Sequence, residues 1–416
     1  MAQIPTILIW SVALVSILGM LLGPRGISEA YWACGGAILL IASGLLPLRQ
    51  AGRAIYEGLD VYLFLAGMMI LAELARQEGV FEWIANIAAR HAGGSPQRLF
   101  LLVYIAGTIV TALLSNDATA VVLTPAVLAV VRRLKAEPKP YLLACAFIAN
   151  AASFVFPISN PANLVVFGAH MPPLISWLRI FAAPSIVSVA ITFVCLRWLL
   201  RTELRAAIEL RIDDRPLTAE GKLALAGLLI SAIALIAASM LGWPLGAPTS
   251  IAAVFAIILV AWRDRGVPLR VAKGIAWSVL PLVAGLFVIV EALQKAGMLR
   301  LAIAAFAQLA QTSAWIAKYT AGFVVAFLSN GMNNLPVGLL AGTALRHSGE
   351  TGIVAHAILL GVDLGPNLSV TGSLATILWL IALRRENVEI TAWEFLRVGL
   401  IAMPLALAAS LLVLLA

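Results

Sequence analysis

Charged residues are scarce in this chain, and their scarcity excludes a water-soluble protein. Only 12% of the 416 residues are Asp, Glu, Lys or Arg, whereas 62% are hydrophobic. A soluble chain carries roughly 25% charged residues, so this one cannot cover a water-exposed surface of its size. Apolar runs long enough to cross a bilayer as helices recur, for example Ile4–Leu22, Leu223–Leu241 and Phe395–Ala416. The composition therefore predicts an all-α polytopic membrane protein.

Cysteine is equally scarce. Cys34, Cys145 and Cys195 lie apart in apolar segments, and no C-x-x-C pair or Cys/His ligand spacing connects them. We therefore expect no metal site and no cofactor. The chain also lacks a G-x-x-x-x-G-K-[ST] phosphate loop and a G-x-S-x-G nucleophile elbow, which argues against an ATPase or a covalent enzyme. The net charge of +8 comes from Lys and Arg between apolar runs, an orientation signal rather than a nucleic-acid interface.

The two halves of the sequence resemble each other. The segment "GMMILAELARQEG" at 67–79 matches "GLFVIVEALQKAG" at 285–297, which aligns Glu73 with Glu291. Further on, "TALLSNDATAVVLTP" matches "VAFLSNGMNNLPVGL", and "FPISNPANLVVFGA" answers "GVDLGPNLSVTGSL". The matches keep one order and a nearly constant offset, which indicates a duplication. We expect a first repeat at 1–200, a charged cytoplasmic linker at 201–221 and a second repeat at 222–416.

A polar interruption stands in the middle of each repeat. About 33 residues lie between Arg98 and Arg132, fewer than the roughly 40 that two full spans require. Two half-depth arms meeting at a polar tip fit this length better, and such a re-entrant hairpin is tolerated where protein or water covers its backbone. We therefore predict hairpins at about 98–135 and 313–346. Prolines interrupt the next span, so broken helices are expected at about 140–171 and 352–383.

Five spans and one hairpin per repeat invert the second repeat relative to the first, because the number of crossings is odd. The result is ten spans and two hairpins with both termini outside. This is the inverted-repeat plan of secondary transporters, whose site lies at broken helices near the midplane. Lys and Arg favour the side of the linker by roughly three to one, which makes that side cytoplasmic.

Polar side chains of the hairpin tips and helix breaks converge in such a fold. The candidate binding residues are Ser115, Asn116 and Thr119 at the first tip; Ser159, Asn160 and Asn163 at the first break; Ser329, Asn330, Asn333 and Asn334 at the second tip; and Asn367, Ser369 and Thr371 at the second break. Amides and hydroxyls donate and accept without carrying charge. Ends of broken helices favour anions or polar oxygens, but the motifs contain no Lys or Arg to hold a carboxylate or phosphate. A small neutral polyhydroxy solute, a small anion or Na⁺ remains.

Asp117 and Asp363 break the repeat symmetry, since Asp117 aligns with Gly331 and Asp363 aligns with an apolar stretch. A low dielectric favours the neutral carboxylic acid, so both are candidate proton-coupling groups or Na⁺ ligands. The alternative is that each caps a half-helix N-terminus. Glu73 and Glu291 are secondary coupling candidates, because packing or ion pairing near the ends of their spans also explains them.

Three segments, "LLSNDATAVVLTP", "FPISNPANLVVFG" and "LSNGMNNLPVGLLAG", resemble the ArsB-type arsenical efflux proteins of the ion transporter superfamily, over essentially the whole chain. The resemblance implies an inner-membrane exporter of arsenite and antimonite driven by proton exchange, with a soluble arsenite-stimulated ATPase as a candidate partner. It also implies that the Ser-Asn tips and Asn160, Asn163 and Asn367 form the site, although the second break reads G-P-N. A sodium/proton antiporter of the same superfamily and a passive channel are the alternatives.

Overall fold

The protein is built from helices. The computed structural model describes residues 3–22, 27–205, 208–209, 216–349 and 352–415, and these residues contain no strand. The first half comprises α1(Gln3–Leu22), α2(Glu29–Ala42), α3(Leu48–Glu57), α4(Leu59–Gln77), α5(Val80–Ala92), α6(Pro96–Leu113), η2(Ala118–Leu123), α7(Thr124–Arg133), α8(Lys139–Ala151), η3(Pro157–Ser159), α9(Pro161–Phe167), η4(Gly168–His170) and α10(Leu174–Leu199). After the turn η5(Glu203–Arg205), the second half comprises α11(Ala219–Met240), α12(Gly246–Ala261), α13(Val267–Gly274), α14(Val279–Lys295), α15(Met298–Ala310), α16(Ala314–Met332), α17(Asn334–Ser348), α18(Ile353–Leu364), η6(Gly365–Asn367), η7(Val370–Gly372), α19(Leu374–Arg385) and α20(Ala392–Val413).

Both halves contain the same succession of helices. Each has two helices, a bent pair, a short helix, two helices joined at a tip, an interrupted helix and a long final helix. The bend is 49° between α3 and α4 and 44° between α13 and α14. Five described helices, α1, α6, α10, α11 and α20, are each long and apolar enough to cross a membrane, and each bent pair adds one more if it forms a single span. Ten spans, the inversion and the outside termini stay predictions.

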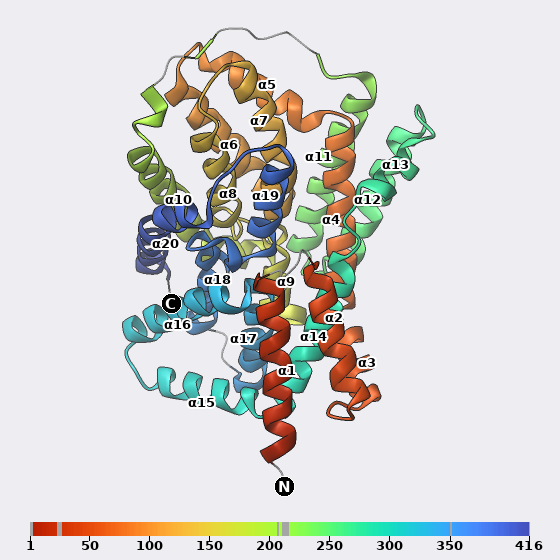
Figure 1. Ribbon diagram of the computed structural model, residues 1–416, viewed down its shortest axis with the longest axis vertical. Helices are drawn as coiled ribbons and strands as arrows, with labels where there is room; N and C mark the ends of the chain where they lie inside the picture. The colour runs from red at the N-terminus through yellow and green to blue at the C-terminus, as the bar shows by residue number, and fades with distance from the viewer. Residues whose placement is uncertain (1–2, 23–26, 206–207, 210–215, 350–351, 416) are drawn as a thin grey trace.

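The two halves pack against each other: the second helix of each half contacts the bent pair of the other, and the two last helices contact each other. α2 packs along α14, α12 packs along α4, and α10 lies against α20 (Figure 1). Gly67 and Gly285, which the sequence repeat aligns, allow the first two contacts. A methyl group on Gly67 would lie 2.8 Å from the Thr249 carbonyl oxygen, and one on Gly285 would lie 2.8 Å from the Ala33 carbonyl carbon. Glycine therefore permits the close backbone approach that helices use inside membranes.

The sequence patterns predict none of the four short helices α3, α5, α13 and α15. These helices carry charged side chains among their apolar ones, so the search for apolar runs passes over them. Gly79 and Gly297 precede α5 and α15 with φ of 72° and 98°, a conformation that glycine adopts without steric cost. The repeat also aligns these two glycines. In Figure 1, α5 lies at the top of the molecule and α15 at the bottom.

The two tips differ from each other. α6 ends at Leu113 and η2 begins at Ala118, so the first Ser-Asn pair lies in the break. In the second half, α16 continues through Ser329 and Asn330, and the chain turns at Asn333, whose φ is 73°. Asparagine is found at positive φ more often than most other non-glycine residues. Within the predicted second tip, the chain therefore turns at Asn333 and not at the Ser-Asn pair.

The first arm of the predicted hairpin is long for a half-depth arm. α6 has 18 residues, which corresponds to about 27 Å of helix. That is close to the roughly 30 Å of a bilayer's hydrocarbon core, so length alone does not decide between a re-entrant arm and a full span. The re-entrant course stays a prediction.

Part of the linker contacts the first half. Glu209 donates its backbone N–H to the Leu134 carbonyl oxygen at 2.9 Å, and its side chain accepts from Lys135 Nζ at 2.7 Å. Residues 206–207 and 210–215 of the predicted linker lie outside the described residues.

Packing between α16 and α18 should depend on Gly361. A methyl group there would lie 2.4 Å from the Gly322 carbonyl oxygen, and overpacking of this kind costs about 1–3 kcal/mol. We expect Gly361→Ala to lower the melting temperature in detergent. Gly35→Ala is the matched control, because no described atom lies within 4 Å of the added methyl group. Equal melting temperatures for the two variants would contradict this packing.

Candidate functional site

Asp117 ends the first tip, directly before the π-helix η2. Ser115 Oγ accepts the Ala118 N–H at 3.2 Å, and Asn116 Oδ1 accepts the Asp117 N–H at 2.9 Å. The Asp117 carboxylate makes no capping hydrogen bond within the described part of the chain. The capping interpretation is therefore wrong for Asp117, whose side chain instead lines a cavity.

This cavity is called the inner cavity because the charge distribution predicts that its side of the molecule is cytoplasmic. It has a volume of about 120 Å³ and lies between α4, the first tip, the α13–α14 connection and α19. Most of its wall is apolar, with Met68, Val121 and Leu374 among the lining residues. Ser115, Asp117 and Glu73 are the polar side chains that the described lining contains. A water molecule needs about 10–15 Å³ of such volume, so a small solute and several waters fit.

Glu73 is held by an ion pair. Its carboxylate accepts from Arg76 Nη2 at 2.5 Å, from Arg76 Nε at 2.7 Å and from Gln77 Nε2 at 2.6 Å. Gly274 packs directly against it, since a methyl group there would lie 1.7 Å from Glu73 Oε1. This geometry favours ion pairing over proton coupling for Glu73.

Asp363 lies where the two interrupted helices meet. It is fully buried in the last turn of α18, and its Oδ1 accepts Asn160 Nδ2 from the first break at 2.7 Å. Its other oxygen, Oδ2, has no hydrogen-bond partner among the described residues, although the Ser153 hydroxyl lies nearby. Asp363 stands at the C-terminal end of its helix, so the capping interpretation is wrong here too. Asn160 Oδ1 instead caps α9 by accepting the Ala162 N–H at 3.0 Å.

An amide–amide contact also joins the two interrupted helices. Asn150 Nδ2 donates to Asn367 Oδ1 at 3.0 Å, and Asn367 Nδ2 donates to the Phe147 carbonyl oxygen at 3.0 Å. Asn150 and Ser153 are buried members of the site that the sequence analysis omits. Two polar residues in the otherwise apolar segment 141–154 are the signal that would have found them.

The second tip is joined to the second break through Asn330. Its Nδ2 donates to the carbonyl oxygens of Ala326 at 2.8 Å and Gly365 at 2.9 Å. Its Oδ1 accepts the Ser369 N–H at 3.0 Å and the Ser369 hydroxyl at 2.6 Å, and Thr371 Oγ1 donates to the Asn330 carbonyl oxygen at 2.9 Å. The convergence of these three predicted residues follows from these contacts.

Two other predicted residues donate hydrogen bonds to backbone carbonyl oxygens in and beside the first break. Asn163 Nδ2 donates to the carbonyl oxygens of Ser153 at 3.0 Å and Pro157 at 3.3 Å, and Ser159 Oγ donates to the Ala112 carbonyl oxygen at 3.0 Å. Such bonds replace those that an interrupted helix loses.

The remaining predicted residues lie within or beside helices. Thr119 Oγ1 lies 2.8 Å from Thr111 Oγ1 inside the first hairpin, and Ser329 Oγ donates to the Val325 carbonyl oxygen at 2.9 Å. Asn333 caps α17 by accepting the Leu335 N–H at 3.3 Å, and Asn334 is buried in its first turn.

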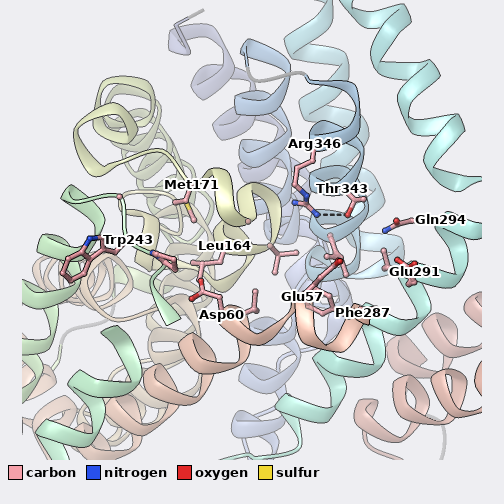
Figure 2. Close-up of a pocket in the computed structure, with 18 residues that line it drawn as sticks. Glu57, Asp60, Leu164, Met171, Trp243, Phe287, Glu291, Gln294, Thr343 and Arg346 are labelled. Carbon is pink, nitrogen blue, oxygen red and sulfur yellow. Dashed lines mark hydrogen bonds between the residues drawn. The ribbon is translucent and has the colours of Figure 1, made fainter. Parts of the chain in front are cut away.

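A larger cavity, called the outer cavity because its side of the molecule is predicted to face outside, contains Glu291, the repeat partner of Glu73. Its volume is about 380 Å³, and it lies between the α3–α4 bend, α9, the α11–α12 loop, α14 and α17 (Figure 2). Its polar lining residues are Glu57, Asp60, Glu291, Gln294, Thr343 and Arg346. The two cavities correspond in part, because Met69, Ala72 and Glu73 of α4 align with Phe287, Val290 and Glu291 of α14. The α17 lining residues align with α7 and not with the first tip. Of the polar lining residues, only Glu291 is a sequence candidate.

Comparison with known proteins agrees with a membrane transporter. Residues 7–361 match the family described as citrate transporter. The chain belongs to this family. It is 29% identical over 407 residues to an arsenical pump membrane protein of Escherichia coli, and 28% identical over 407 residues to one of Yersinia enterocolitica, with 94% of both chains covered in each case. It is thus a multi-pass integral membrane protein, consistent with the inner membrane.

The fold of this family member is similar to that of a solved transporter. The crystal structure of the YdaH transporter of Alcanivorax borkumensis, reported to have an unusual topology, matches with a TM-score of 0.57 at 16% identity. The match covers 99% of this chain and 97% of that one.

The contact between Asn160 and Asp363 should appear as an energetic coupling. Asn160→Ala and Asp363→Ala should destabilise the protein together by less than the sum of the single effects, because each single change leaves a buried polar group unpaired. The double-mutant cycle, measured by denaturant titration in micelles, should give about 0.5–3 kcal/mol. The cycle of Asp363→Ala with Asn163→Ala is the control, since Asn163 binds backbone carbonyls. A larger coupling in the control cycle would contradict the assignment.

Proposed function

We propose that this transporter exports trivalent metalloids, arsenite and antimonite, in exchange for protons and so confers arsenic resistance. Similarity to arsenical pumps over 94% of the chain supports the substrate class. The observation that carries the mechanism is the pair of carboxylates, Asp117 and Asp363, set among neutral amides and hydroxyls at the tips and breaks.

The neutral polar groups suit a neutral substrate. Arsenite near pH 7 is an uncharged trihydroxide, whose OH groups donate and accept hydrogen bonds as Asn and Ser side chains do. Citrate is a poorer fit, because a tricarboxylate would be expected to recruit Arg or Lys, and the tip and break motifs contain neither. The inner cavity also provides room for a small solute beside Ser115 and Asp117.

The two carboxylates supply the coupling in this proposal. Among the described residues neither Asp117 nor Asp363 forms an ion pair. A buried carboxylate without a nearby cation is costly in its charged form, so each of the two is proposed to bind a proton during the transport cycle. Protonation from outside and release to the cytoplasm would then accompany the departure of the metalloid.

An inverted arrangement of the halves gives the alternating access that export needs. The inner cavity adjoins the basic α13 region, which the charge distribution assigns to the cytoplasm, whereas the outer cavity adjoins the α11–α12 loop. The positions of α5 and α15 at opposite ends of the molecule support the inversion (Figure 1). Ten spans, two hairpins and outside termini complete this proposal, and a soluble ATPase is an optional partner rather than a requirement.

Everted vesicles with an acidic lumen test the proposal. Radiolabelled arsenite should accumulate inside them without ATP and without sodium, antimonite should compete, and citrate should not. Asp117→Asn and Asp363→Asn should each reduce this uptake by about tenfold or more, the scale of a typical coupling between two ligands. Uptake that survives in the double variant would contradict the coupling. Sodium-dependent proton movement without arsenite would instead indicate a sodium/proton antiporter.

A further inference from the structure

Glu291 and Glu73 occupy aligned positions in the two repeats, but their surroundings differ. Glu73 is paired with Arg76 and Gln77. At the same spacing after Glu291 the sequence has Gln294 and Lys295, and Lys295 Nζ donates to the Leu45 carbonyl oxygen at 3.0 Å. Across the described residues, no ion pair or hydrogen bond reaches the Glu291 carboxylate. Gln294 stands where Arg76 stands in the first repeat, so this carboxylate has no ion-pair partner at that position. Arg53, His347 and Glu57 act on it only through longer-range electrostatic interactions.

The position of Glu291 exposes it to water. It is half-buried on the wall that α14 contributes to the outer cavity, with Gln294 one turn further on and Phe287 one turn before (Figure 2). A volume of about 380 Å³ holds many waters. One side of the carboxylate therefore meets the contents of the cavity, and the other meets the apolar packing of α14.

Other charged groups around the cavity already have partners. On α3, Glu57 accepts from Arg53 Nε at 3.0 Å, and at the start of α4, Asp60 accepts the Gly246 N–H at 2.8 Å. On α17, Arg346 donates to Thr343 Oγ1 at 2.9 Å, as Figure 2 shows, and His347 Nδ1 lies 2.9 Å from the Thr343 carbonyl oxygen. The remaining charged residues of the helices packed on α14 are Arg49 of α3, Arg76 and Glu73 of α4, Arg300 of α15 and Glu29 of α2.

We propose that Glu291 is the group at which the transporter takes up its proton from the outside. The inference rests on the proposed proton-coupled export and adds the entry point. The carboxylate binds a proton from the water of the outer cavity, and the buried carboxylates of the site carry the exchange further. Glu73 is not equivalent on the inner side, because Arg76 and Gln77 already donate to its carboxylate. Because of this difference between the repeats, the proton enters on the side of Glu291 and not on the side of Glu73.

Two assays in everted vesicles, whose lumen corresponds to the outside, test this assignment. The first is arsenite uptake driven by an acidic lumen, and the second is arsenite counterflow at equal pH on both sides. Glu291→Gln should reduce driven uptake about tenfold or more and remove its dependence on lumen pH, while counterflow stays within about twofold, since neutral Gln imitates the protonated state. Glu291→Asp should restore driven uptake.

Glu57→Gln is the matched control, because it removes another carboxylate from the same cavity and should retain both activities. If Glu291→Gln vesicles still take up arsenite in response to an acidic lumen, with the same dependence on lumen pH as the unmodified protein, the assignment is overturned. Loss of counterflow together with uptake, in a variant that elutes as a folded protein, would also overturn it by indicating a role in substrate binding. Failure of the unmodified protein to use the pH gradient would refute the proposed function itself, whereas the Glu291→Gln result refutes only the entry point.

Discussion

Backbone groups freed inside the membrane must find partners within the protein, and asparagine side chains supply many of them here. Each break in an apolar helix exposes N–H and C=O groups that lipid cannot satisfy. Asn163 holds the first break by donating to Ser153 and Pro157, and Asn330 holds the second by donating to Gly365. The tips and breaks therefore have defined positions, and a polar site can exist in an otherwise apolar protein.

The same arrangement explains how carboxylates are tolerated there. Asp363 is buried but accepts from Asn160, a residue of the other half, so its environment depends on how the two halves are placed. Asp117 faces a small cavity beside the α13–α14 connection, again a segment of the other half. Relative movement of the halves would change the surroundings of both carboxylates, which is the property that exchange of a proton for a solute requires.

Much of this arrangement could be predicted from the sequence, because the duplication places corresponding residues in both halves and the alignment reveals them. The aligned glycines Gly67 and Gly285 seat helices of the opposite half, and the Ser-Asn and Asn-rich segments mark the tips and breaks. Hydropathy fails where helices are amphipathic, as in α5 and α15, and where a single residue such as Asn333 turns the chain. The pairing of Asn150 with Asn367 and the outer cavity depend on tertiary contacts between distant segments, which no local pattern specifies.

Proton movement coupled to arsenite movement is the central claim, and purified protein in liposomes tests it most directly. Liposomes loaded with arsenite and a trapped pH-sensitive dye are diluted into arsenite-free buffer without sodium or ATP. Our account predicts that the lumen acidifies as arsenite leaves, because each departing metalloid is exchanged for protons. Arsenite loss with no change in lumen pH would contradict the account and indicate a passive channel.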